Sequence, residues 1–330
     1  MRIAVILTVL NEGESIRAVL DSLRAQTRAP DEVVVADGGS SDSTLSVLRE
    51  YQDRLPLKVI ETPGANISQG RNAAIRVANA DIVAATDAGV RCAPDWLEQL
   101  MRPFTPGAPA PAGEKEVAAA AGFFQSDPAS VFEMALGATV LPEARDVNPS
   151  TYLPSSRSVA YRKAVWETVG GYPEWLDFCE DVVFNLKVRE KYGPFVFVPE
   201  ALVHFQPRGS LRAFFRQYYQ YARGDGKAGL FPRLHLVRYL TYLGAAPLLI
   251  YAALTVSPWL WLVGLAAGLA YLRLPLRRAA RHLPGLRPLD VIRLLLYLPL
   301  IRVTGDVAKM IGYPAGVWWR MQLRRNFGAF

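Results

Sequence analysis

The feature that most limits the fold of this chain is a run of 34 residues without a charged side chain, Tyr239–Leu272. One straight helix of that length would measure about 50 Å, well beyond the roughly 30 Å hydrocarbon core of a bilayer. Ser257-Pro258 lies in the middle of the run, so the pattern predicts two helices, Tyr239–Val256 and Trp259–Leu272, joined by a tight turn. We expect this hairpin (residues 239–272) to be a membrane element, with a buried hairpin in a soluble core as the alternative.

The distribution of charge supports membrane attachment. The chain carries 37 Lys and Arg against 30 Asp and Glu, a net charge of +7, and residues 236–330 hold 12 of the basic residues but only two acids. Basic residues flank both ends of the hairpin and are missing from its tip, which predicts that both ends face the cytoplasm. We therefore expect the cytoplasmic face of the inner membrane as the location and an anionic membrane surface as a partner. Nucleic acid is not expected, because no nucleic-acid-binding motif is present.

A further apolar stretch, residues 290–311, contains Arg293, Arg302, Asp306 and Lys309. Charges at this spacing predict a helix that lies in the membrane interface rather than a third span. The sequence thus predicts two domains, residues 1–225 and a membrane-associated helical region at residues 226–330.

Short apolar runs and helical patterns alternate in the first domain. The apolar runs predict buried strands at Ile3–Leu10, Val33–Ala36, Leu57–Ile60 and Ile82–Ala85. Helices are predicted between them at Ser15–Ala25, Thr44–Tyr51 and Ile67–Val77, and later at Ser130–Leu141, Asp181–Lys191 and Ser210–Arg223. This alternation is typical of a Rossmann-like α/β fold with a mostly parallel, doubly wound sheet. Residues 103–113, rich in Pro, Gly and Ala, predict a surface loop.

Polar side chains directly follow three of the predicted strands. Asn11 and Glu12 follow the first strand, Asp37 closes the second, and Asp87 follows the fourth. Because ligands bind beyond the carboxyl ends of strands in open α/β sheets, we expect these side chains to meet in one crevice. Each one alone has a structural explanation, such as a helix cap.

The loop after the second strand, residues 37–44, points to an anionic ligand. Gly38 lets the backbone approach a ligand closely, and the loop leads into a helix whose N-terminus favours anions. The sequence contains neither a GxGxxG motif after the first strand nor a GxxxxGK[ST] motif, so a dinucleotide fingerprint and a P-loop are both excluded.

Five stretches together resemble the family 2 glycosyltransferases, in that family's order and over roughly residues 1–225: residues 8–12, 37–44, 70–72, 86–89 and 180–181. The resemblance implies a GT-A fold and the inverting transfer of a single sugar from a UDP- or GDP-sugar. The implied acceptor is a hydroxyl group on a lipid-linked or membrane-proximal molecule. A polyprenyl-phosphate glycosyltransferase, whose phosphate acceptor needs no strong base, is one alternative. A non-catalytic, membrane-tethered module that binds nucleotide sugars is another.

The resemblance also implies roles for single residues. Arg71 would approach the diphosphate of the nucleotide, and Asp87 would contact its ribose. The nucleoside pocket would be lined by Thr8, Asn11, Glu12, Asp37 and Gly38. Asp181 matches the general base, and Glu180 beside it is expected near the acceptor. A carboxylate at a helix start in a partly apolar cleft is basic enough for this work. The alternative is that Glu180-Asp181 only caps a helix.

The expected metal site departs from the family pattern. The D-x-D element would read Asp87-Ala88-Asp, but Gly89 takes the last place. The resemblance implies a divalent cation, Mn²⁺ or Mg²⁺, held by Asp87. We expect His204 as the ligand that replaces the missing carboxylate, because Mn²⁺ tolerates imidazole. Weak or absent metal dependence is the other outcome, and a purely structural role is the alternative for His204.

Two clusters are predicted to face the sugar or the acceptor. Ser156 and Arg157, in the turn before a predicted strand, would contact the donor sugar or an acceptor phosphate; an ordinary polar turn is the alternative. Arg216 and Arg223 lie seven residues apart on one face of a predicted helix and would clamp a diphosphate, unless they form a solvated or membrane-facing stripe. This helix resembles the place of the processive Q-x-x-R-W motif but lacks its Trp, which counts against a polymer synthase.

Overall fold

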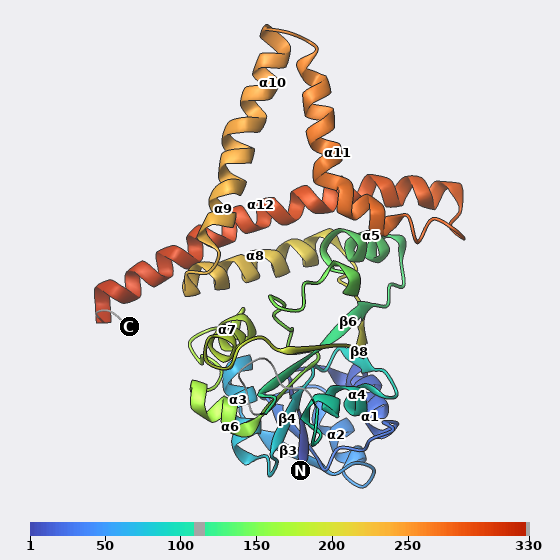
Figure 1. Ribbon diagram of the computed structural model, residues 1–330, viewed down its shortest axis with the longest axis vertical. Coiled ribbons are helices and arrows are strands. Elements are labelled where there is room, and N and C mark those ends of the chain that lie inside the picture. The colour runs from blue at the N-terminus through green and yellow to red at the C-terminus, as the bar shows by residue number, and fades with distance from the viewer. Residues whose placement is uncertain (109–115, 328–330) are drawn as a thin grey trace. The chain divides into compact units, whose positions relative to one another are not determined.

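The computed structural model describes residues 1–108 and 116–327, and the chain forms two compact units (Figure 1). The first unit comprises residues 1–127 and 143–206, and the second comprises residues 128–142 together with the chain from residue 207 onward. The division therefore differs from a boundary at residue 225, because helices α5 (Val131–Val140) and α8 (Leu211–Ala228) pack in the second unit. Residues 109–113 of the predicted surface loop lie outside the described residues.

The first unit is built on one mixed eight-stranded sheet in the order β3-β2-β1-β4-β7-β6-β8-β5. Neighbours β3, β2, β1 and β4 are parallel, and so are β6 and β8, whereas β7 runs antiparallel to β4 and β6, and β5 to β8. The strands are β1 Ile3–Val9, β2 Glu32–Asp37, β3 Leu57–Glu61, β4 Ile82–Ala85, β5 Val90–Cys92, β6 Ala119–Ser126, β7 Val159–Arg162 and β8 Val196–Phe205. The four predicted parallel strands are confirmed.

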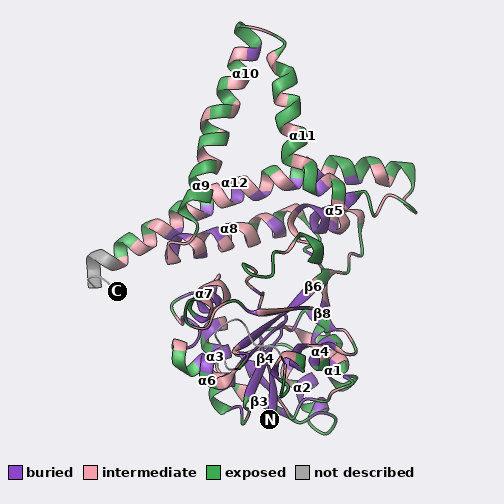
Figure 2. Cartoon of the chain, viewed as in Figure 1, coloured by how far each residue is buried: buried purple, intermediate pink, exposed green. Residues whose placement is uncertain are grey.

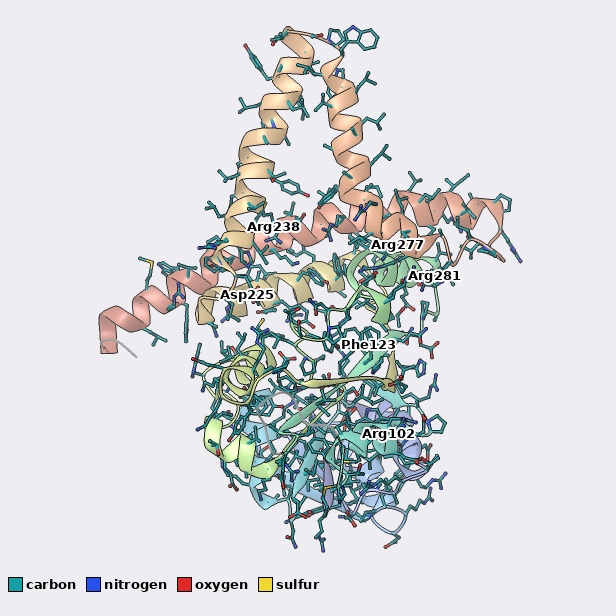
Figure 3. The ribbon with its side chains drawn as sticks, in the orientation of Figure 1. Arg102, Phe123, Asp225, Arg238, Arg277 and Arg281 are labelled. Atoms are coloured by element: carbon teal, nitrogen blue, oxygen red, sulfur yellow. The ribbon has the colours of Figure 1, made fainter. Side chains whose placement is uncertain are left out.

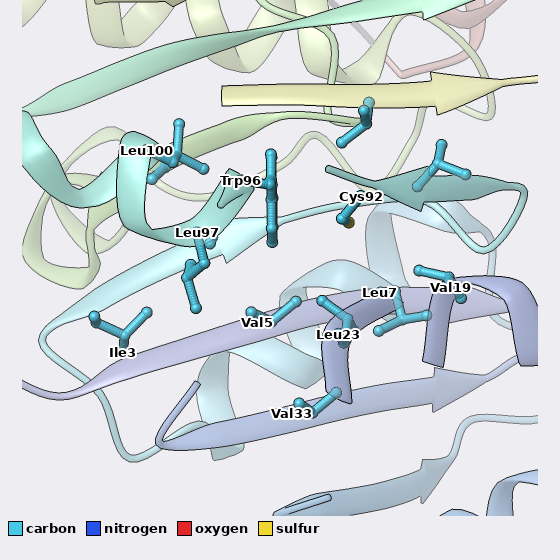
Figure 4. Close-up of a cluster of buried hydrophobic side chains, with 14 of the residues drawn as sticks. Ile3, Val5, Leu7, Val19, Leu23, Val33, Cys92, Trp96, Leu97 and Leu100 are labelled. Atoms are coloured by element: carbon cyan, nitrogen blue, oxygen red, sulfur yellow. The ribbon is translucent and has the colours of Figure 1, made fainter. Parts of the chain in front are cut away.

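Hydrophobic clusters cover both faces of this sheet. Along β1, Val5 and Leu7 belong to one cluster and Ile6 to the other, because successive side chains of a strand point to opposite faces (Figure 4). A strand buried on both sides must be apolar throughout, which explains the unbroken run in the sequence. The helices of this unit are α1 Ile16–Arg24, α2 Thr44–Tyr51, α3 Ile67–Val77, α4 Trp96–Met101, α6 Lys163–Val169 and α7 Glu180–Tyr192.

The second unit is helical, and helix α12 (Pro288–Phe327) packs along α8. Glycines make this contact close: a Cβ on Gly312 would lie 2.3 Å from the carbonyl oxygen of Tyr219, and one on Gly316 would lie 2.1 Å from that of Arg223. The predicted interfacial helix at residues 290–311 was therefore too short. Helix α12 continues through Pro314, and Gly316 beyond it still packs against the backbone of α8.

A helical hairpin belongs to the second unit. Its first arm runs through α9 (Pro232–Tyr239), a π-helical segment η4 (Leu240–Ala245) and α10 (Ala246–Thr255), and its second arm is α11 (Leu260–Ala279). Both arms are long and apolar enough to cross a membrane, and only 6% of each apolar window is buried (Figure 2). The predicted pair of apolar helices is thus confirmed, although α11 continues seven residues beyond Leu272.

Candidate active site

The carboxyl ends of β1, β2 and β4 lie at one edge of the sheet, as expected. Val9 is the register partner of Asp37, and Ile6 is that of Ala85. The Gly38 amide donates to the carbonyl oxygen of Val9 at 2.9 Å. The loops that carry Asn11, Asp37 and Asp87 therefore leave neighbouring strands on the same side, which is where ligands bind in such sheets.

Asp37 is fully buried and organises its own loop. Its Oδ2 accepts hydrogen bonds from the amides of Gly39 at 3.0 Å and Ser40 at 2.9 Å, and its Oδ1 accepts one from the Ser40 hydroxyl. Asn11, at a positive φ of 55°, ties the first loop to the second, since its Oδ1 accepts from the Ser41 amide at 2.9 Å. Contact of Asp37 with a nucleotide base stays a prediction.

Thr8 and Glu12, also predicted for the pocket, lie near the end of β1 and in the loop that follows it. Thr8 packs under helix α3, where a Cβ on Gly70 would lie 2.9 Å from the Thr8 methyl carbon. The Glu12 amide donates to Thr44 Oγ1 at 2.9 Å, and the Glu12 carboxylate accepts from Ser15 Oγ at 3.1 Å. Each of these side chains therefore has a structural task, and their nucleotide contacts stay predictions.

Arg71 lies at the centre of a buried charge cluster. Its Nη1 donates to Glu180 Oε1 and its Nη2 to Asp87 Oδ1, the latter at 2.9 Å, and its guanidinium lies 5.5 Å from the ring centre of Tyr172. The Arg71 side chain is 3% exposed and that of Glu180 is 7% exposed, whereas Asp87 is 31% exposed. Arg71 thus joins helix α3, the end of β4 and the start of α7 in one network.

Burial and charge act against each other in this cluster. Burial raises the pKa of Glu180 to about 7, and the neighbouring charge of Asp181 adds to the rise, although Arg71 opposes it. Burial alone would lower the pKa of Arg71, but Glu180 and Asp87 raise it above its ordinary value, so the guanidinium stays charged. The cluster holds a permanent positive charge between two carboxyl groups.

Asp181 is placed differently from its neighbour Glu180. It stands in the first turn of α7 and is partly exposed, and its Oδ1 accepts from the Val182 amide at 2.8 Å. Its Oδ2 lies 3.5 Å from the amide nitrogen of Ser156. The preceding residue, Cys179, has a positive φ of 63°, so the chain enters α7 by a sharp turn. Asp181 is therefore the carboxylate of the pair that solvent and a ligand can reach.

Arg157 brings a second guanidinium to Asp87. Its Nε lies 3.6 Å from Asp87 Oδ2, and its guanidinium packs over the Phe205 ring at 4.7 Å. Its carbonyl oxygen accepts from Thr86 Oγ1 at 2.9 Å, which fixes the turn that carries it. Ser156 is buried with its hydroxyl 3.4 Å from that of Tyr172. The predicted cluster of Ser156 and Arg157 thus lies beside Asp87 and Asp181.

The donor set for a divalent cation is poor. No group of three or more His, Cys, Asp or Glu side chains that could hold a metal occurs in residues 1–108 and 116–327. The two oxygens of Asp87 face Arg71 and Arg157. Successive side chains of a strand point to opposite faces, so His204 lies on the other face of β8 from Phe205, and its register partner is Arg91. Burial lowers the pKa of His204, and the charge of Arg91 lowers it further. These residues do not form a cation site, and the placement of His204 does not support its predicted role as a ligand.

Arg216 and Arg223 belong to the second unit. Both lie on α8, where Arg216 is exposed and Arg223 donates from Nη1 to Gln220 Oε1 at 3.3 Å. Their predicted role as a diphosphate clamp stays a prediction.

Sequence reasoning missed the residues that hold the charge cluster in place. Tyr172 stacks on Phe184 and shares hydroxyl contacts with Ser156 and Tyr161, so it supports Arg71 from one side. Asn72 accepts from the amide of Tyr172 at 3.0 Å. The signal for Asn72 was its place in the stretch 70–72 beside Arg71, but no role was assigned to it; nothing in the pattern placed Tyr172 there.

The chain is similar to known glycosyltransferases. Residues 4–112 match the family model described as Glycosyl transferase family 2. The chain is 35% identical over 112 residues to validoxylamine A glucosyltransferase of Streptomyces hygroscopicus subsp. limoneus, a match that covers 33% of this chain but only 25% of that protein. It is 25% identical over 270 residues to the succinoglycan biosynthesis protein ExoA of Rhizobium meliloti (strain 1021), covering 78% of this chain and 80% of that protein.

A solved structure shares the fold. The mannosyltransferase PcManGT from Pyrobaculum calidifontis, determined in complex with GDP-Man and Mn²⁺, superposes with a TM-score of 0.63 over 94% of this chain and 87% of that chain, at 21% sequence identity. Together with the family match, this likeness confirms the fold that the motifs predicted. Residues 4–112 therefore belong to a family 2 glycosyltransferase domain, and the chain has the GT-A fold.

Proposed function

We propose that this protein is an inverting glycosyltransferase that transfers a single sugar from a nucleoside-diphosphate sugar to a hydroxyl group of a membrane-proximal acceptor. The observation that carries the proposal is the difference in burial between two adjacent carboxyl groups. Glu180 is buried and bound to Arg71, whereas Asp181 is accessible at the start of α7. One carboxylate of the pair is thus left to accept a proton from an acceptor.

In the proposed reaction, Asp181 removes the proton of the acceptor hydroxyl as its oxygen attacks the anomeric carbon. The sugar then separates from the nucleoside diphosphate on the opposite face, so the anomeric configuration inverts. The hydrogen bond from the Val182 amide and the helix N-terminus orient the Asp181 carboxylate. A positioned base of this kind contributes about 10²- to 10⁴-fold to the rate.

The leaving diphosphate needs positive charge as its bond to the sugar breaks. Arg157 is the proposed source, because its side chain is 23% exposed and lies beside Asp87 at the strand ends. Arg71 acts less directly, because it is buried and already bonded to Asp87 and Glu180. We propose that Arg71 holds α3, Asp87 and the start of α7 together.

The donor and the acceptor follow from the comparisons and the second unit. The structural neighbour binds GDP-Man, and another relative takes part in succinoglycan biosynthesis by its name, so we propose a UDP- or GDP-sugar as donor and a glycan or glycolipid acceptor. The exposed apolar hairpin would hold the enzyme at the cytoplasmic face of the membrane, where a lipid-linked acceptor is found.

The test is the variant Asp181→Asn in the full-length protein. A thermal-shift screen of UDP, GDP, CDP and dTDP, with and without Mn²⁺, first identifies the nucleotide, because a ligand that binds the folded state raises the unfolding temperature. The D181N variant should lose about 10²- to 10⁴-fold in turnover of the matching nucleotide sugar while the nucleotide still stabilises it. Glu190→Gln, exposed on the same helix, is the matched control and should keep full activity.

Two results would contradict the proposal. Turnover that persists in D181N would remove Asp181 as the base and favour an acceptor that needs none, such as a polyprenyl phosphate. Nucleotide binding by the wild-type protein without transfer or slow donor hydrolysis would instead favour a binding module.

A further inference from the structure

A cavity in the second unit has the composition of an anion site. It has a volume of about 550 Å³ and lies between α11, α12 and the end of α5. Three arginines line it, Arg273 and Arg278 from α11 and Arg302 from α12, and none of its described lining residues is acidic. The rest of the wall includes apolar side chains such as Val140 and Leu274. Three arginine side chains in a lining whose described residues include no acid suit a negatively charged ligand.

Arg302 supplies the most direct evidence. Its Nε is buried and has no hydrogen-bond partner among the described residues, and its guanidinium stacks over the Tyr271 ring at 4.8 Å. A buried donor without an acceptor is costly and rare in a native structure, so its presence points to a missing ligand. The ring fixes the plane of the guanidinium, which suits recognition of a phosphate by paired N–H groups.

The acid one helical turn from Arg302 on α12 is already bonded to other groups. Asp306, one turn further along α12, accepts from Arg238 Nε at 2.7 Å, from the Tyr242 hydroxyl at 3.2 Å and from the Tyr271 hydroxyl. Tyr271 thus gives its hydroxyl to Asp306 and its ring face to Arg302. Asp306 neutralises Arg238, and the charge of Arg302 remains for the cavity.

The position of the cavity on the hairpin indicates where its ligand comes from. Arg273 is the first charged residue after the apolar run; Arg277 lies in the last turn of α11, and Arg281 follows just beyond its end (Figure 3). The side chains of α11 before Arg273 are exposed and apolar, among them Leu265 and Leu269. A membrane that covers this apolar surface would end at the level of Arg273, where lipid headgroups lie.

We propose that this cavity binds the phosphate headgroup of a membrane lipid, whose oxygens accept hydrogen bonds from Arg302 and Arg278 while its chains lie along α11. The apolar wall beside the arginines suits the first carbons of a lipid chain, which a free phosphate ion lacks. The site is a property of the second unit and does not rest on the proposed sugar transfer.

The test measures binding, without donor or turnover. Full-length protein in dodecyl maltoside is titrated with short-chain phosphatidate, phosphatidylcholine of the same chain length and inorganic phosphate, and binding is followed by native mass spectrometry. We expect phosphatidate to bind, and both Arg302→Gln and Arg278→Gln to weaken it at least tenfold. Arg287→Gln removes one charge from an exposed position outside the cavity and should change the affinity less than twofold.

Each outcome decides the proposal. Equal phosphatidate affinity in R302Q, R278Q and R287Q would overturn it, and so would inorganic phosphate that binds as well as the lipid. Arg302→Lys keeps the charge but loses the planar guanidinium, so it should bind phosphatidate with intermediate affinity. This variant also shows whether weak binding by R302Q comes from a folding defect. The D181N variant should bind phosphatidate as the wild type does, so failure of the catalytic proposal and failure of this one are separable.

Discussion

Removal of the Arg71 guanidinium tests whether the buried charge cluster holds the first unit together. In Arg71→Met, Glu180 loses its counter-charge while it stays buried, and Asp87 keeps only Arg157 nearby. Breaking a buried ion pair by removing one partner costs about 3 to 5 kcal/mol, because a buried charge is left uncompensated. Arg71→Lys keeps the charge but cannot bond both carboxylates at once, so its stability should be intermediate.

The same helix offers a matched control. Arg76 also pairs with a carboxylate, that of Glu174 at 3.0 Å, but the two side chains are 58% and 40% exposed. Removing such a surface pair costs no more than about 1 kcal/mol. Urea unfolding followed by tryptophan fluorescence should therefore show Arg71→Met at least about 2 kcal/mol less stable than Arg76→Met. If the two variants unfolded with the same urea midpoint and the same dependence on urea concentration, Arg71 would not be the residue that links α3, Asp87 and α7.

Three further predictions concern protonation, packing and the metal site. Burial raises the pKa of Glu180 to about 7 from its ordinary 4.5, so the folded state favours the protonated carboxyl group. The stability that this group contributes is therefore complete below pH 4.5 and is lost as the pH rises through 7. In Glu180→Gln, the urea midpoint should change less with pH over this range. Gly316→Ala should lower the free energy of unfolding of the full-length protein by about 1 to 3 kcal/mol, seen as a lower thermal midpoint, because its Cβ meets the backbone of α8. In Gly268→Ala the added Cβ meets no atom within 4 Å, so this control variant should be neutral or stabilising. Gly89→Asp also has open space around its Cβ, so the variant should fold normally and make nucleotide binding, read by thermal shift, more dependent on Mn²⁺; unchanged Mn²⁺ dependence would count against the cation site implied at Asp87 and residue 89.

Local pattern was enough for most of the elements in the first unit. α2 and α3 begin and end where their amphipathic spacing placed them, since each helix buries one face and its neighbours are turns. β5 was not predicted, because a three-residue strand has too little periodicity, and the apolar run Phe195–Val198 predicted only the first part of β8. Pairing with β6 and β5 keeps β8 extended to Phe205, and only the assembled sheet provides that pairing.

The sequence by itself determined the class of the fold, the residues at the strand ends and the apolar hairpin, because each depends on periodicity or on the order of neighbouring residues. Only the tertiary structure decided how the charges are shared. It buried Arg71 between Glu180 and Asp87, left Asp181 accessible, turned His204 to the other face of β8 and brought Arg302 beside Arg278. These arrangements join residues from 16 to more than 100 positions apart, and their energies depend on burial and distance, which no local pattern contains.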